Sequence, residues 1–198
     1  MAAGVAGLIL AGGAGERYGG PKAFARLPDG RPFLMACAEL LAAGGTAPLL
    51  ATLPPGTPAL DSPLLETVAL PAAGLPMFDS LRLGLAQLLG DLTWRAVVVL
   101  PVDHPLVAPA TVSALAAVQA EAVLPSYQGK HGHPVVLSRR VAEGIVAGRL
   151  AGPTLREVLH SVGTSSVEVG DPGVTANCNT PEALAAALQS RERGSRPA

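Results

Sequence analysis

An apolar run at residues 5–11 leads directly into a glycine-rich loop, and this junction constrains the fold more than any other feature of the sequence. The run is typical of a buried strand. The loop contains Gly12, Gly13 and three further glycines, together with Arg17 and Lys22. Glycines let backbone N–H groups approach an anion closely, and guanidinium and ammonium groups bind phosphate oxygens. The sequence therefore predicts a polyphosphate site after the first strand.

Two commoner phosphate-binding motifs do not fit this loop. A Walker A loop needs Ser or Thr after Gly-Lys, whereas Pro21 and Ala23 flank Lys22. A dinucleotide fingerprint meets Tyr18 where its third glycine belongs, and the next strand ends in Leu-Pro-Pro at residues 53–55, without the carboxylate that would hold a ribose. The remaining alternative is a glycine-rich turn with incidental charges.

Apolar extended runs alternate with helical patterns along the chain, which predicts a three-layer α/β/α, Rossmann-like domain with a mostly parallel sheet. The expected strands are at residues 5–11, 48–53, 65–70, 95–100, 122–125, 134–137 and 164–169. Helices are expected at residues 33–43, 79–89 (with Asp79 as N-cap), 109–120, 139–147, 154–160 and 180–189, and a loop through His131. We expect one domain, residues 1–190, and a disordered polar tail, residues 191–198.

Composition excludes several functional classes. The chain has 198 residues, 49% of them hydrophobic, which suffices for one substantial core. A net charge of −1 and only 3% aromatic residues argue against nucleic acid as a partner. The apolar start lacks a basic region and is too short to cross a bilayer, and the cysteines, Cys37 and Cys178, suggest no disulfide framework. We expect a cytoplasmic protein without membrane association.

A second site element follows the expected strand at residues 95–100. There Asp103 lies between Pro101 and Pro105. A carboxylate at the carboxyl end of a buried strand is well placed to bind Mg²⁺, which favours one or two carboxylates together with substrate phosphates. The alternative is a structural carboxylate that caps the turn or the next helix.

Together these segments resemble the nucleotidyltransferase family that works on the molybdenum cofactor. The resemblance rests on LAGG-x-G-x-R-x-G-x-x-K at residues 10–22, P-V-D-x-P at residues 101–105, S-L-x-x-G-L at residues 80–85 and G-x-x-G-H-P at residues 129–134. It implies a GT-A-like nucleotidyltransferase fold with a mixed sheet. It also implies transfer of NMP from CTP or GTP to the phosphate of molybdopterin, with release of pyrophosphate. A sugar phosphate or another small phosphorylated acceptor stays an alternative, and a molybdoenzyme client is a possible partner.

The resemblance assigns a role to each matching residue. Arg17 would contact the β- and γ-phosphates, Lys22 would stabilise charge between the α-phosphate and pyrophosphate, and Asp103 would hold Mg²⁺. Ser80 would form part of the nucleotide-binding wall, and His133 would line the acceptor side unless its role is purely structural. The backbone that cradles base and phosphates would come from Leu10, Ala11, Gly12, Gly13 and Gly15.

One segment departs from the family pattern. Where the family resembles D-x-D-T-P-E-D, this chain has Asn177-Cys178-Asn179 before Thr180. Asn179 would be the second metal ligand, and its amide oxygen brings no negative charge. Three interpretations stay open: an enzyme with one metal carboxylate, a nucleotide- or cofactor-binding carrier that has lost turnover, or a turn with no ligand role.

Other signals are weaker. Gly12-Gly13 resembles the guanylyl branch and Pro21 the cytidylyl branch, so the base is open. His131 and His133 with Cys178 could suggest zinc, but their spacing matches no common ligand set. Arg139 and Arg140 are expected to form the solvated start of a helix.

Overall fold

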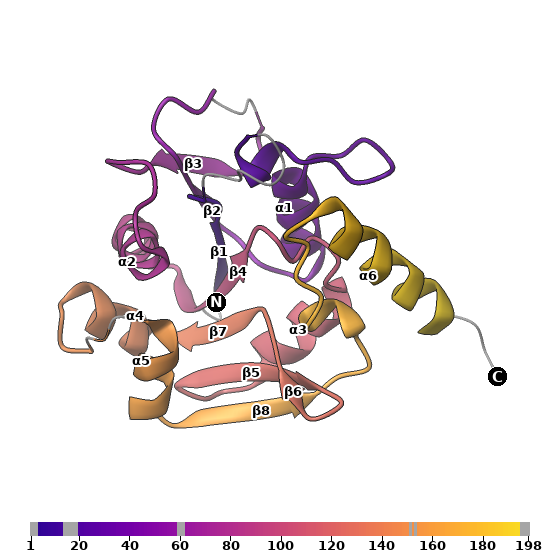
Figure 1. Ribbon diagram of the computed structural model, residues 1–198. Coiled ribbons are helices and arrows are strands. Elements are labelled where there is room, and N and C mark those ends of the chain that lie inside the picture. Colours follow the sequence, from indigo (N-terminus) through magenta and orange to yellow (C-terminus); the bar gives the residue numbers. More distant parts are fainter. Residues whose placement is uncertain (1–3, 14–19, 59–61, 151, 153, 195–198) are drawn as a thin grey trace.

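The computed structural model describes residues 4–13, 20–58, 62–150, 152 and 154–194. Within these residues, eight strands form one sheet in the order β3-β2-β1-β4-β7-β5-β6, with β8 paired to β5 (Figure 1). Their bounds are β1 Gly4–Leu10, β2 Leu49–Leu53, β3 Glu66–Ala69, β4 Trp94–Pro101, β5 Ala122–Tyr127, β6 Lys130–His131, β7 Val135–Ser138 and β8 Thr164–Glu168.

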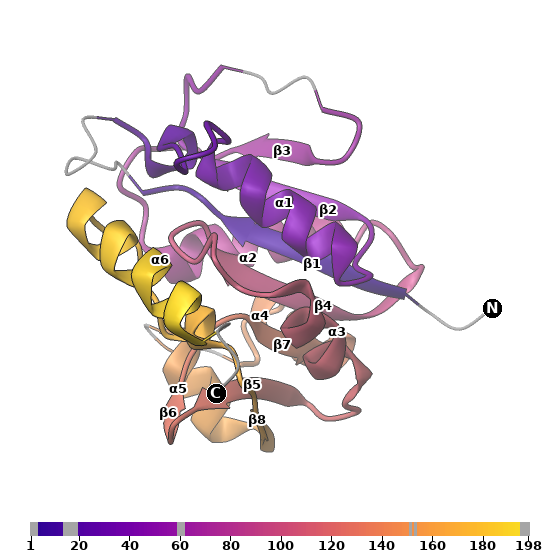
Figure 2. The same ribbon diagram turned by 90° about the vertical axis from the view of Figure 1, so that its right-hand side faces the viewer.

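Helices cover both faces of this sheet, as the apolar strand patterns predict. They are α1 Phe33–Ala43, α2 Met77–Leu88, α3 Pro109–Ala117, α4 Arg139–Val146, α5 Leu155–Ser161 and α6 Pro181–Gly194. Helices α1, α3 and α6 lie on one face (Figure 2), and α2, α4 and α5 lie on the other. A hydrophobic cluster lies under each set of helices. The three-layer α/β/α architecture is therefore confirmed.

The sheet is mixed, with its parallel part at the predicted site. Strand β1 pairs in parallel with β2 and β4, whereas β7 runs antiparallel to β4 and β5. Leu10 at the end of β1 is in register with Pro101 at the end of β4, and the Val102 N–H donates to the Leu10 carbonyl at 3.0 Å. The loops that follow these two strands therefore start side by side.

A glycine sets how closely α2 approaches the sheet. A Cβ atom at Gly84 would lie 2.6 Å from Leu8 Cδ1 on β1 and 3.1 Å from Thr52 Cγ2 on β2. Real Cβ contacts are longer, so the S-L-x-x-G-L pattern permits an approach that any side chain at this position would prevent. Ser80 lies one helical turn before Gly84 and is carried close to the end of β1.

Several expected boundaries were wrong. Pro76, not Asp79, occupies the N-cap of α2, and Asp79 lies in the first turn, where a carboxylate favours the helix dipole. Helix α3 ends at Ala117 because Val118 is already extended. The expected loop through His131 contains strand β6, which forms a hairpin with β5 through Gln128 and Gly129, both at positive φ.

The last helix is longer than its sequence indicated. It starts as predicted, since Thr180 Oγ1 accepts a hydrogen bond from the Ala183 N–H at 3.2 Å. It continues to Gly194, so residues 191–194 are helical rather than part of a tail. Residues 195–198 lie outside the described part of the chain.

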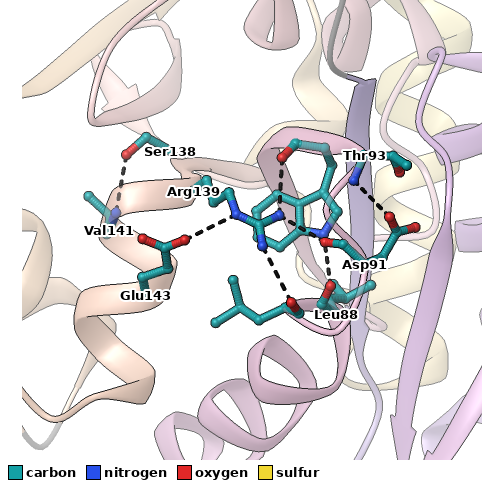
Figure 3. Close-up of polar contacts among 9 residues, drawn as sticks. Leu88, Asp91, Thr93, Ser138, Arg139, Val141 and Glu143 are labelled. Atoms are coloured by element: carbon teal, nitrogen blue, oxygen red, sulfur yellow. Dashed lines mark hydrogen bonds and ion pairs between the residues drawn. The ribbon is translucent and has the colours of Figure 1, made fainter.

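Arg139 is not the solvated side chain that the sequence suggested. Its guanidinium donates to the backbone carbonyls of Asp91 (2.8 Å), Trp94 (3.3 Å) and Leu89 (3.3 Å), as Figure 3 shows. Arg139 Nε also donates to Glu143 Oε1 at 3.1 Å, and Arg139 Cζ lies 4.6 Å from the centroid of the Trp94 ring. Arg139 therefore ties the start of α4 to the connection between α2 and β4.

Arg140 behaves as expected. Its side chain is 75% exposed and pairs with Glu121. No helix in the described ranges is both long and apolar enough to cross a membrane.

Candidate active site

Three segments far apart in the sequence bring Lys22, Asp103 and Asn179 together. The Lys22 ammonium lies 3.2 Å from Asp103 Oδ2 and donates a hydrogen bond to Asn179 Oδ1. The side chains of Lys22 and Asp103 are only 18% and 15% exposed. The predicted phosphate lysine and both predicted metal ligands thus share one partly buried cluster.

Core packing and backbone hydrogen bonds hold the members of this cluster in place. Lys22 begins a short 3-10 helix whose next residue, Ala23, is fully buried against the core. Asp103 follows β4, and its backbone carbonyl accepts a hydrogen bond from the Cys178 N–H at 2.8 Å. Cys178 is buried, so Asn179 is fixed beside Asp103. The asparagine segment therefore lies against Lys22 and Asp103, and its role as a metal ligand stays a prediction.

The Asp103 carboxylate keeps one oxygen available. Its Oδ1 atom is buried and accepts no hydrogen bond from the described residues, and His104 Nε2 lies 3.9 Å from it. A hard divalent cation prefers carboxylate and amide oxygens such as those of Asp103 and Asn179. These residues fit such a cation, but only one of them carries charge.

The zinc alternative is not supported. Within the described ranges, which include His131, His133 and Cys178, no group of three or more His, Cys, Asp or Glu residues could hold a metal. Burial, and secondarily the Asp103 charge, raises the pKa of the Cys178 thiol to about 11. This thiol is therefore protonated near neutral pH, unlike a thiolate ligand.

The predicted nucleotide side begins at the carboxyl end of β1. A Cβ atom at Gly12 would lie 2.4 Å from Leu70 Cδ1 and 3.3 Å from Ser80 Oγ, so a side chain here would displace Leu70. Ser80 is buried and its hydroxyl donates to the Pro76 carbonyl at 3.3 Å. Gly13 is exposed and a Cβ there would meet no atom within 4 Å.

Some of the other residues predicted to bind the nucleotide lie at this edge, and the rest lie outside the described residues. Leu10 and Ala11 are buried, and the Ala11 N–H is bonded to the Thr52 carbonyl at 3.1 Å, so that donor already has a partner. Gly15 and Arg17 lie outside the described residues, and their roles remain predictions.

A cavity of about 1100 Å³ is lined by His104, which follows Asp103, and by Asn177. All four histidines of the chain line it, together with Lys130 and Arg156. No Asp or Glu is among the described residues that line it. The histidine, lysine and arginine residues of the lining are His104, His131, His133, His160, Lys130 and Arg156. A smaller apolar cavity of about 250 Å³ adjoins it and shares His133. The large cavity is suited to an anionic ligand.

His133 lines the large cavity and packs against His104, the residue after Asp103. The backbone N–H of His133 donates to the Val174 carbonyl at 2.8 Å, and a Cβ at Gly132 would lie only 2.1 Å from that oxygen. This close backbone contact explains the glycine of the G-H-P segment. The His133 ring lies 4.8 Å from the His104 ring, centroid to centroid.

Both of these histidines are neutral at neutral pH. Burial, followed by the neighbouring His104, lowers the pKa of His133 to about 4. Burial also lowers the pKa of His104, although the Asp103 charge opposes this shift. His104 and the cationic rim of the cavity were missed from the sequence. The available signals were that His104 directly follows Asp103 and that Lys130 and His131 belong to the G-x-x-G-H-P segment.

A family model described as the MobA-like NTP transferase domain matches residues 7–168, most of the chain. The chain belongs to the MobA-like NTP transferase family. The match includes the β1 loop, Lys22, Ser80, Asp103 and His133, and ends before Asn179. No curated protein matched the chain by sequence.

Solved structures share the fold over nearly the whole chain. Rv0371c from Mycobacterium tuberculosis is 26% identical with a TM-score of 0.78, covering 96% of this chain and 100% of that one. A second structure of Rv0371c, a complex with manganese, is 24% identical with a TM-score of 0.74 and the same coverage. Molybdopterin-guanine dinucleotide biosynthesis protein A from Archaeoglobus fulgidus is 17% identical with a TM-score of 0.65, covering 94% and 98% of the chains.

One further structure comes from another nucleotidyltransferase. It is 2-C-methyl-D-erythritol 4-phosphate cytidylyltransferase from Thermus thermophilus, 19% identical with a TM-score of 0.66, covering 96% of this chain and 100% of that one. At these identities, the last two structures establish the fold alone. The expected GT-A-like nucleotidyltransferase fold is thereby confirmed.

Proposed function

We propose that this protein transfers NMP from CTP or GTP to the phosphate of a molybdopterin-type acceptor and releases pyrophosphate. The observation that carries the proposal is the convergence of Lys22, Asp103 and Asn179 at the carboxyl edge of the sheet, where the loops after β1 and β4 start side by side. Family membership supports an NTP as the donor, and Lys130 and Arg156 in the lining of the large cavity support an anionic acceptor.

Charge neutralisation and positioning would supply most of the catalysis. Attack on the α-phosphorus places negative charge on phosphate oxygens and on departing pyrophosphate, and fixed cations stabilise it. The Lys22 ammonium, already oriented by two side chains, would meet this charge. Arg17 would bind the outer phosphates. Gly12, backed by Ser80, would let the nucleotide approach the backbone.

A divalent cation held by Asp103 and Asn179 would neutralise further charge on the phosphates. Mg²⁺ is the proposed ion, and the manganese complex of Rv0371c agrees with a divalent cation in this fold. Because only Asp103 is charged, phosphate oxygens of the nucleotide would have to complete its coordination.

The acceptor would enter the large cavity beside His133. At neutral pH this ring is uncharged, so it would orient the acceptor through a hydrogen bond rather than attract it by charge. Lys130 and Arg156 would provide the attraction, since both carry positive charge at the rim of the cavity.

The test is release of pyrophosphate by the purified protein with Mg²⁺, molybdopterin and either CTP or GTP. We expect release with one of the two nucleotides, strongly slowed by Asp103→Asn and retained by Glu39→Gln, a matched change at an exposed carboxylate. A sugar phosphate replaces molybdopterin in a parallel reaction. Release only with the sugar phosphate would reject the molybdopterin acceptor and keep nucleotidyl transfer.

Asn179 favours one second candidate, a nucleotide- or cofactor-binding carrier without turnover that could serve a molybdoenzyme client. Its uncharged amide weakens the metal site in comparison with a second carboxylate. A carrier would bind CTP or GTP without releasing pyrophosphate, and Asn179→Asp would restore release. Absence of nucleotide binding would reject both candidates.

A further inference from the structure

A cation of the chain itself, the Lys22 ammonium, lies at the proposed metal site. A single ammonium, that of Lys22, contacts both Asp103 Oδ2 and Asn179 Oδ1. These oxygens come from different segments, β4 to α3 and the turn before α6. The same two side chains are those to which the proposed function assigns the divalent cation.

Lys22 therefore competes with a divalent cation for Asp103 Oδ2 and Asn179 Oδ1, and leaves only Asp103 Oδ1 unoccupied. Both Lys22 and Asp103 are more than four-fifths buried, so water screens their charges weakly. A divalent cation beside the ammonium would meet strong repulsion. It would also find the Asp103 charge already neutralised, and Asn179 adds none.

A bound triphosphate would change this balance. An ammonium has three donors and no fixed fork geometry, so it can turn to phosphate oxygens that come near it. Phosphates would attract Lys22 away from Asp103 and Asn179, and would also offer oxygens to the metal. The described residues alone provide no cluster of three or more His, Cys, Asp or Glu ligands, so these extra oxygens matter.

We infer that Lys22 closes the cation site until an NTP binds, so that the nucleotide and the divalent cation bind with positive coupling. The inference rests on the proposed NTP site. It assigns Lys22 a second role besides stabilising charge on the phosphates: it prevents the protein from holding a metal ion without substrate. Coupling of this kind is reciprocal, so the cation must also raise the affinity for nucleotide by the same factor.

The test is titration of the full-length protein with Mn²⁺, followed by water-proton relaxation, which separates protein-bound from nucleotide-bound Mn²⁺. The wild type, Lys22→Met and Arg140→Gln are compared, the last being a matched loss of an exposed cation. Without nucleotide, Lys22→Met should bind Mn²⁺ at least about tenfold more tightly than the wild type, since about 1.4 kcal/mol of relieved repulsion gives this factor. Arg140→Gln should match the wild type.

A second arm adds the non-hydrolysable α,β-methylene analogue of CTP or GTP. In the wild type it should tighten Mn²⁺ binding to the protein, and this coupling factor should shrink in Lys22→Met. Asn179→Asp adds charge but keeps the ammonium, so it should bind Mn²⁺ more tightly and retain the coupling. Urea unfolding of each variant verifies that it is folded.

Equal Mn²⁺ affinity in the wild type and Lys22→Met would overturn the inference. If the analogue still binds in that case, the proposed function stands without the closed site. If no analogue binds, the proposed function fails, while the nucleotide-free comparison still decides whether Lys22 blocks the cation.

Discussion

Lys22 and Arg139 are cations buried to a similar extent, but Arg139 bonds mainly to backbone carbonyls and Lys22 to side chains. Their side chains are 18% and 21% exposed. Arg139 donates to three backbone carbonyls and stacks on Trp94, partners that the fold itself fixes. Lys22 instead binds the side chains of Asp103 and Asn179, which a ligand can take over. Exposure alone does not distinguish a structural cation from a functional one, whereas the chemistry of the partners does.

The strongest test of this contrast is Lys22→Ala. We expect the rate of pyrophosphate release to fall about 10²–10³-fold, the usual cost of removing one fixed donor to developing charge. The protein should stay folded with a moderately lower free energy of unfolding, because the substitution leaves the Asp103 carboxylate without its ammonium partner but removes no core contact. Steady-state kinetics and urea unfolding measure the two effects. Full activity in this variant would make Lys22 a structural residue like Arg139.

The two regions should also differ in their response to pH. The pKa of His133 is about 4 in the folded protein and near 6.5 when unfolded, so the unfolded state binds more protons between these values. Stability should therefore fall as pH drops from 6.5 to 4, by about 3 kcal/mol from this residue.

Urea unfolding at pH 7 and pH 4 checks this effect. His133→Asn should lose less stability than the wild type over that interval. Arg139→Ala should keep the wild-type pH dependence, because arginine does not titrate there. An unchanged pH dependence in His133→Asn would contradict this account, because the pKa of the ring would then be the same in the folded and unfolded protein.

A smaller effect is expected from Arg139→Ala itself. Loss of a guanidinium that bonds buried carbonyls and covers an aromatic ring should lower the free energy of unfolding by about 2 kcal/mol. Arg140→Ala, at the exposed neighbour, should cost less than about 1 kcal/mol. Pyrophosphate release by the folded Arg139→Ala protein should stay near the wild-type rate. A large loss of activity with unchanged stability in Arg139→Ala would make Arg139 a functional residue and contradict this contrast.

The sequence predicted the parts of the molecule that local chemistry determines. The β1 run, the glycine junction and Asp103 after β4 could be placed because strand ends of a parallel sheet meet at one edge. Lys22, Asp103 and Asn179 indeed lie together. Gly15 and Arg17 remain predictions, since they lie outside the described residues.

Other features depended on tertiary contacts that no local pattern contains. Arg139 resembles any cation at a helix start until Trp94 and the end of α2 are placed beside it. His104 gains a place in the cavity only because β7 brings His133 against it. The basic side chains in the lining of the cavity likewise come from separate elements, Lys130 from β6 and Arg156 from α5.

The central claim, that Lys22 and Asp103 act as one catalytic unit, is tested most directly by a double-mutant cycle on kcat/KM for pyrophosphate release. Residues that act together give strongly non-additive losses. The account predicts that the Lys22→Ala/Asp103→Asn protein is slower than the slower single variant by less than about tenfold. Losses that multiply fully across the two substitutions would contradict it, because the two side chains would then act independently.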